Sequence, residues 1–161
     1  MNPLKSLIAA AWLAAGSSAA IAQPADADPL GWFTESSGGR LELAYGEPDT
    51  DNIAITFFCR PGEGAVHVQI FSEVPGDDER PMGSSWETSF DLLSGATQGE
   101  YRAIATMTET GPLIADARIP VDDPVIQAFR RSGLLTAHHN PISAETQRER
   151  RIIQLFLDTC G

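Results

Sequence analysis

The chain has 161 residues, with 22 acidic side chains against 11 lysines and arginines and a formal net charge of −11. This acidity excludes the basic surface that nucleic-acid binding needs, and an anionic membrane would repel the chain for the same reason. Lys5 is the only lysine, so the chain beyond residue 22 has ten arginines against 22 acids, a net charge of −12, and no lysine for Schiff-base or P-loop chemistry.

Residues 1–22 have the three parts of a secretory signal peptide. Lys5 gives the basic start, residues 7–15 form the apolar core, and Ala20-Ile21-Ala22 is a small-x-small cleavage site. The core is too short to span a bilayer stably, although an uncleaved membrane anchor is the alternative. We expect cleavage after Ala22 and a periplasmic or secreted protein with no later integral membrane segment.

Residues 23–31 are rich in proline and aspartate without periodicity, which predicts a flexible N-terminal arm. Residues 32–161 have the length of a single domain. Short runs with alternating apolar and polar residues predict antiparallel strands, because the turns between them are too short for parallel crossovers. We expect a mainly β fold, an antiparallel β-sandwich or a small barrel. The predicted strands are 31–35, 40–46, 53–60, 65–74, 84–95, 100–109 and 112–121.

Towards the C-terminus the apolar residues no longer alternate with polar ones and follow helical spacing instead. A short helix is predicted there, over residues 122–133. Asp122 or Asp123 can cap its start, Pro124 suits the first helical position, and Gly133 suits the end. Residues 134–141 are either a short edge strand or a loop.

A second helix is predicted over residues 143–161, with Ser143 as its N-cap and Gly161 at its end. Its apolar residues share one face at helical spacing. They are Ile152, Ile153, Phe156, Leu157 and Cys160.

The chain has two cysteines, Cys59 and Cys160. Cys59 shares the apolar phase of its strand with Ile55 and Phe57, and Cys160 lies on the apolar face of the last helix. An oxidising compartment favours a disulfide between them, which would link the C-terminal helix to the sheet. The alternative is a catalytic thiolate, but no neighbouring residue supplies the base that would lower its pKa.

The three histidines, His67, His138 and His139, are candidate metal ligands. Adjacent histidines in a strand point to opposite faces, and no zinc-binding spacing is present, so we predict no metal site. The acidic turns at 49–52 and 76–79 could offer calcium ligands, but they lack the EF-hand pattern, and turn formation explains their aspartates.

No catalytic or cofactor motif stands out. The sequence lacks G-x-S-x-G and G-x-G-x-x-G, and Ser84 and Ser85 have no neighbouring partners that mark a triad. The arginines at 148, 150 and 151 fit a solvated helix face paired with Glu145 and Gln147. Trp32 and Phe33 fit core anchors better than a ligand platform. We predict no catalytic residue, no cofactor and no enzyme activity.

A signal peptide, short antiparallel strands, the segment 123–133 and a terminal amphipathic helix follow one another in this chain. In order and spacing, roughly the last 100 residues resemble the invasion-associated locus B family of alphaproteobacteria, or another exported family of similar build. The chain differs in having only two cysteines and an arginine-rich terminal helix. The resemblance implies a short helix near residues 133–136, a final segment packed on a sandwich, and an envelope protein without catalysis.

Two functions are consistent with these patterns. The first is a non-enzymatic periplasmic binding or envelope module, with another envelope protein as its expected partner. The second is an acidic inhibitor of a cationic enzyme, such as a lysozyme, or a carrier of a small ligand. The sequence leaves the ligand and the oligomeric state open.

Overall fold

The computed structural model describes residues 30–72, 80–109, 113–137 and 139–161. The predicted signal peptide, the acidic turn at 76–79 and His138 lie outside the described residues, as does the predicted arm up to residue 29. The first strand already includes Gly31, the residue at which the arm was predicted to end.

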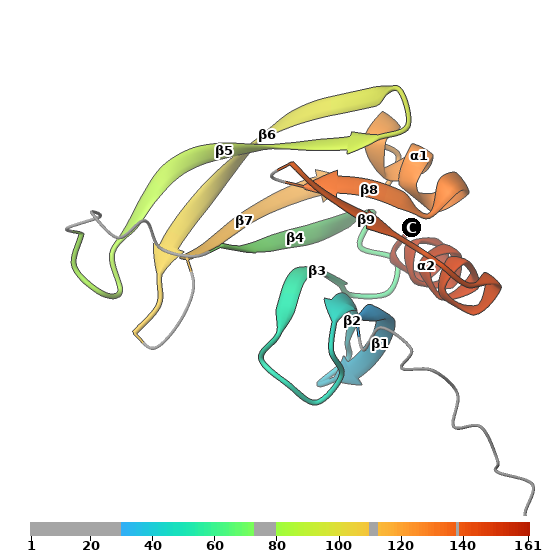
Figure 1. The fold of residues 1–161 in the computed structure, drawn as a ribbon, viewed down its shortest axis with the longest axis horizontal. Helices are drawn as coiled ribbons and strands as arrows, with labels where there is room; N and C mark the ends of the chain where they lie inside the picture. The colour runs from blue at the N-terminus through green and yellow to red at the C-terminus, as the bar shows by residue number, and fades with distance from the viewer. Residues whose placement is uncertain (1–29, 73–79, 110–112, 138) are drawn as a thin grey trace, which may run out of the picture.

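Nine strands form one antiparallel sheet in the order β1-β2-β3-β4-β7-β6-β5-β8-β9. The sheet curls, so that β1 and β2 lie on one side of helix α2 and β8 and β9 on the other (Figure 1). The mainly β prediction is therefore confirmed, with a single curled sheet as the architecture. The strands are β1 (Gly31–Ser37), β2 (Arg40–Gly46), β3 (Ile53–Cys59), β4 (Ala65–Ser72), β5 (Ser85–Ser94), β6 (Thr97–Met107), β7 (Leu113–Pro120), β8 (Leu134–Ala137) and β9 (Asn140–Ser143).

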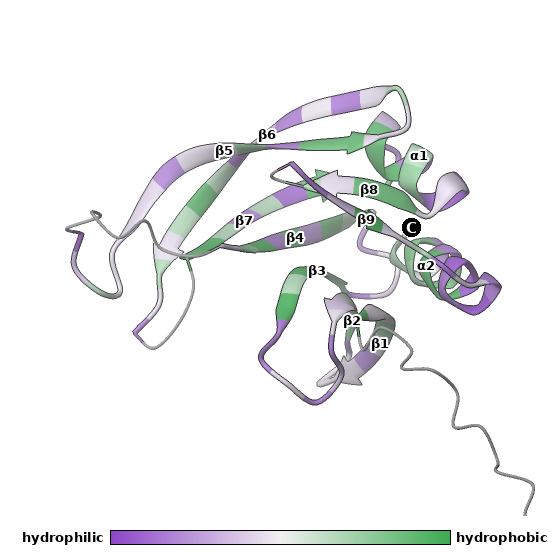
Figure 2. Ribbon diagram, in the orientation of Figure 1, coloured by the Kyte–Doolittle hydropathy of each residue, from purple (hydrophilic) through white to green (hydrophobic). Residues whose placement is uncertain are grey.

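The core lies between the inner face of the sheet and the two helices. Figure 2 shows hydrophobic and hydrophilic residues alternating along the central strands, as a sheet with one buried face requires. Trp32 packs at ring-centroid distances of 5.1 to 6.0 Å against Tyr45, Phe57 and Phe129. Trp32 is 4% exposed, so its predicted role as a core anchor is confirmed.

Helix α1 (Pro124–Ser132) begins and ends where the sequence predicts. The Asp123 side chain accepts a hydrogen bond from the Val125 N–H, and Pro124 occupies the first turn. Gly133 ends the helix in the left-handed conformation, with φ of 69°. A side chain there would be strained by this conformation, and its Cβ atom would lie only 2.9 Å from the Ala144 Cβ.

The segment predicted as either an edge strand or a loop is a strand, β8, that forms a hairpin with β9. This hairpin corrects the predicted start of the second helix. Ser143 pairs with Leu134 in the hairpin and cannot cap the helix, so α2 (Gln147–Cys160) begins later, with Thr146 as its N-cap. Thr146 and Glu149 form a reciprocal capping box.

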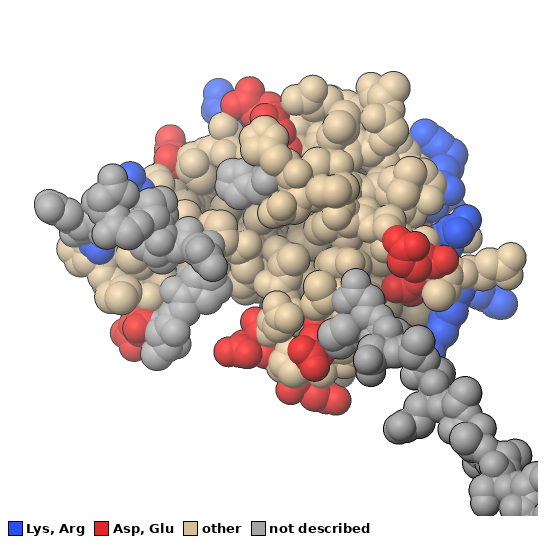
Figure 3. Space-filling view, in the orientation of Figure 1, with Lys and Arg blue, Asp and Glu red and all other residues tan. Residues whose placement is uncertain are grey.

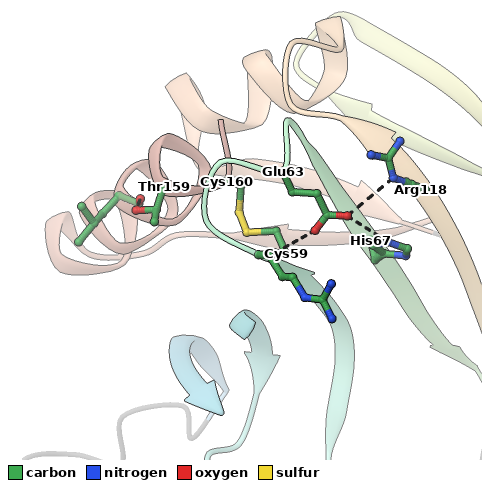
Figure 4. Close-up of a disulfide and its surroundings, with 8 residues drawn as sticks. Cys59, Glu63, His67, Arg118, Thr159 and Cys160 are labelled. Carbon is green, nitrogen blue, oxygen red and sulfur yellow. Dashed lines mark hydrogen bonds and ion pairs between the residues drawn. A yellow bond between two sulfur atoms is a disulfide. The ribbon is translucent and has the colours of Figure 1, made fainter. Parts of the chain in front are cut away.

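The predicted disulfide between Cys59 and Cys160 is present and joins the end of β3 to the end of α2. Both cysteines are at most 1% exposed. The loop after β3 adds two backbone hydrogen bonds to the same helix end: the Gly62 N–H donates to the Thr159 carbonyl and the Gly64 N–H to that of Cys160, both at 2.8 Å. The C-terminus is thus fixed to β3, the third strand in the sheet order (Figure 4).

Candidate functional site

Charged and aromatic side chains lie together on the outer face of the sheet, over β3, β4 and β7. Alternation along β4 turns Val66, Val68 and Ile70 into the core. His67 and Gln69 occupy the opposite, partly exposed phase. Because the sheet pairs β4 with β7, these two side chains meet the outward residues Asp116 and Arg118.

We define the His67 cluster as Glu63, His67, Gln69, Asp116 and Arg118. His67 lies between two carboxylates, with Nδ1 3.5 Å from Asp116 Oδ1 and Nε2 3.9 Å from Glu63 Oε1. Arg118 Nε is also 3.9 Å from Glu63 Oε1, and the Gln69 amide donates to Asp116 Oδ2 at 3.1 Å. Carboxylate acceptors and nitrogen donors therefore lie next to one another across β4, β7 and the loop that precedes β4.

An aromatic stack adjoins this cluster. The rings of Phe58 and His67 are nearly parallel, with an interplanar angle of 8° and centroids 4.9 Å apart. The guanidinium of Arg40 also lies over Phe58, 4.7 Å from the centroid of its ring, and Arg40 pairs with Glu42 at 3.5 Å. Stacking fixes the plane of the His67 ring, so its two nitrogens face the two carboxylates.

Glu63 is held in its charged form by the loop that carries it. The Arg60 N–H donates to Glu63 Oε2 at 2.9 Å, and this hydrogen bond lowers the pKa of Glu63 against the opposing effect of desolvation. His67 and Arg118 lower the pKa further. Figure 4 shows Glu63 directed at both side chains from the loop next to the disulfide. The disulfide therefore also fixes the position of this carboxylate.

Two hollows open on this face. One, of about 290 Å³, is lined by Arg40, Phe58, Cys59, Arg60, Glu63 and His67. The other is a groove of about 730 Å³ over β5, β6 and β7, whose polar lining includes Glu87, Ser89, Glu100 and Arg102. Asp116 and Arg118 line this groove and also belong to the His67 cluster, so the two regions form one polar surface.

The His67 cluster presents oriented charged groups on the surface of the sheet. His67 is oriented by carboxylates, but no serine, threonine or cysteine of the described residues is hydrogen-bonded to it as a nucleophile would be. Within the same part of the chain, no three His, Cys, Asp or Glu side chains are placed to hold a metal ion. Charged groups on rigid strands can instead pair with complementary charges of a partner.

The other residues singled out from the sequence lie away from this cluster. His139 is in the turn between β8 and β9. The Ser85 hydroxyl bonds to that of Thr106 at 2.9 Å, while the Ser84 hydroxyl is buried without a partner. Asp49 has a φ of 63° in the hydrogen-bonded turn between β2 and β3, in agreement with the turn explanation for these aspartates.

The predicted pairing of the α2 arginines with Glu145 and Gln147 is not found among the described residues. Glu145 precedes the helix and accepts a hydrogen bond from Ser143, and Asp158 of α2 pairs with Arg130 of α1. Figure 3 shows arginine side chains gathered on the side of the molecule formed by the two helices.

Sequence reasoning missed the His67 cluster. Its only signal was that His67 and Asp116 each occupy the polar phase of a predicted strand. The alternation does not indicate which strands become neighbours. In the sheet β4 lies next to β7, and β6 and β5 follow on the other side of β7.

The chain is thus a curled antiparallel sheet anchored by a disulfide to its C-terminal helix, with a charged outer face. No family model, curated protein or solved structure matches it. In the described part of the chain, no helix is long and apolar enough to cross a membrane.

Proposed function

We propose that the protein is exported and serves in the periplasm as a non-enzymatic binding module for another envelope protein. The signal-peptide pattern of residues 1–22 supports export, and so does the Cys59–Cys160 disulfide, because such bonds persist in oxidising compartments. The resemblance to the invasion-associated locus B family implies the same role.

The His67 cluster is the observation that carries the binding role. Its charged groups stand half-exposed on paired strands, and the disulfide fixes the loop that bears Glu63. Preorganised charges of this kind lose little entropy on binding and favour a partner with complementary charges. We expect that partner to place a cation near Glu63 and Asp116.

An affinity capture from envelope extract tests the proposal. The bait is the chain from residue 23, compared with the double variant Glu63→Gln/Asp116→Asn and with a matched control, Asp51→Asn/Glu109→Gln, which removes two carboxylates elsewhere. A protein retained by the first and third baits but released from the second supports the proposal. Equal retention on all three baits, or no retained protein, contradicts it.

The acidic surface also favours a second function, inhibition of a cationic enzyme. Glu87, Glu100 and Asp116 line one groove, and Glu63 stands beside it in the charged form. Loss of lysozyme activity at about micromolar concentrations of this protein would support inhibition. The same assay with Glu63→Gln/Asp116→Asn would show whether this face is responsible. Unchanged lysozyme activity would remove the second function and leave the first.

A further inference from the structure

A groove between the first strand and the last helix has the features of a peptide-binding site. We name it the β1–α2 groove. It has a volume of about 390 Å³ and shares no lining residue with the His67 cluster, so a ligand bound there would use a different set of contacts from the partner proposed for that cluster. Its lining includes Thr34, Ser36, Leu41, Ile152, Leu155 and Phe156.

One wall of the groove is an edge of the sheet that no other described strand pairs with. Among the described residues, β1 is the first strand of the sheet and pairs only with β2. The Trp32 N–H points away from β2, because it donates to Glu149 Oε1 at 3.0 Å. Hydrogen-bonding directions alternate along an antiparallel strand, so the backbone groups of Thr34 and Ser36 point to this same edge. Such an edge can pair with an added strand.

The inner face of β1 changes from buried to exposed along the strand. Trp32 is buried, but Thr34 and Ser36, which share its phase, are exposed and polar. Opposite them, Leu155 of α2 is 67% exposed, although Ile152 and Phe156 beside it are partly or fully buried. The groove therefore offers apolar contacts on the helix and backbone hydrogen bonds on the strand.

The rim of the groove carries an unbalanced negative charge. Glu35 of β1 lies directly opposite Glu42 of β2 in the strand pairing, and both line the groove. Like charges at opposed positions destabilise a strand pair. Arg40 pairs with Glu42, whereas Glu35 has no ion pair among the described residues. A cationic group of a partner would relieve this repulsion.

We infer that the β1–α2 groove binds an extended segment of another polypeptide, with alternating apolar residues and a basic residue facing Glu35. Strand addition supplies the affinity through main-chain hydrogen bonds, and the pocket beside Leu155 selects the apolar side chains. A second copy of this chain fits less well. Pairing two β1 edges would bring two acidic rims together, between chains of net charge −11 each.

Titration of a synthetic peptide tests this inference. The probe is a seven-residue peptide of alternating valine with arginine or threonine, compared with the same peptide N-methylated at alternate residues. Methylation removes main-chain donors but keeps the apolar side chains. We expect the first peptide to bind, at affinities measurable below about 1 mM, and the methylated one not to bind. A version with glutamate in place of arginine should bind more weakly.

Protein variants locate the site. Leu155→Gln should weaken peptide binding about tenfold, the cost of removing one well-packed apolar side chain from an interface. Met82→Gln is the matched control, since Met82 is 64% exposed on another part of the molecule, and should bind as the unmodified chain does. Equal binding of the methylated peptide, or equal affinities for the two variants, would overturn the inference. So would a dimer in sedimentation that Leu155→Gln dissociates.

Discussion

Glu149 joins the first strand to the last helix, since its Oε1 accepts the Trp32 N–H at 3.0 Å across 117 residues of sequence. Its Oε2 accepts from both the backbone N–H and the hydroxyl of Thr146, each at 2.8 Å. One carboxylate thus satisfies a donor at a sheet edge and closes the capping box that starts α2. Docking of the edge strand and formation of the helix start therefore depend on the same side chain.

Replacement of Glu149 should lower the free energy of unfolding more than replacement of an ordinary exposed carboxylate at a helix start. We expect Glu149→Ala to lower the free energy of unfolding by about 1–3 kcal/mol, because it removes the cap and leaves the half-buried Trp32 N–H without its acceptor. Glu145→Ala, which removes an exposed carboxylate just before the helix, is the control and should cost less than about 0.5 kcal/mol. Urea unfolding of both variants measures the difference, and equal losses would contradict this role.

The same carboxylate should make stability depend on pH. Burial alone would raise the pKa of Glu149, but hydrogen bonds from Trp32 and Thr146 outweigh it and hold the pKa below the ordinary value of 4.5. A group whose pKa is lower in the folded state stabilises the fold above its unfolded pKa, and loses that contribution as the pH falls through its folded pKa. The stability difference between the unmodified chain and Glu149→Ala should therefore shrink below pH 4.5. A difference that stays constant to lower pH would contradict the assignment.

Tyr101 and Asp123 form a second link, between β6 and the start of α1. The Tyr101 hydroxyl donates to Asp123 Oδ1 at 2.7 Å, and the same oxygen accepts the Val125 N–H that caps the helix. Burial, together with the bond to the Asp123 carboxylate, raises the pKa of Tyr101 well above that of a free tyrosine.

Stability and titration measurements both test the Tyr101–Asp123 link. Tyr101→Phe should cost about 1–2 kcal/mol of stability, the value of a hydrogen bond to a charged group. Because the folded pKa is raised, the contribution is complete below the unfolded pKa near 10 and is lost as the pH rises further. In an ultraviolet titration of the folded protein, Tyr101→Phe should remove a tyrosine that ionises well above the pH at which a free tyrosine does. Loss of a tyrosine that ionises like a free one would contradict the link.

The strands β1 to β7 and their buried faces can be predicted from alternation alone, because a period of two determines which side chains reach the core. The disulfide is predicted by the same reasoning, since the apolar phases of Cys59 and Cys160 both point inward. The start of α2 was missed although Thr146 and Glu149 have the spacing of a capping box. Ser143 is an equally good cap in isolation, and only its pairing with Leu134 in the hairpin excludes it.

The His67 cluster could not be predicted for a different reason. His67 contacts Asp116 because β4 pairs with β7 and not with β5, the next strand in the sequence. Strands β6 and β5 lie on the far side of β7. Strand order is a property of the whole sheet, and local alternation carries no information on which strands become neighbours. The same holds for the β1–α2 groove, whose two walls come from opposite ends of the domain.

The Cys59–Cys160 bond gives the most direct test of the fold. The two cysteines are 101 residues apart, and closing a loop of this length stabilises a chain by roughly 4–5 kcal/mol in the chain-entropy model. Cys59→Ser and Cys160→Ser should therefore lower the free energy of unfolding by similar amounts, and the double variant should lose about as much as either one, because each single change already breaks the bond.

Urea unfolding of the three variants measures these losses, and unfolding of the unmodified chain with and without reductant provides the control. Reductant should destabilise the unmodified chain and leave the variants unchanged. Losses that differ strongly between the two single variants would indicate a separate role for one thiol. In all three variants the disulfide is absent, and the hydrogen bonds from Gly62 and Gly64 to Thr159 and Cys160 still join the loop after β3 to the end of α2.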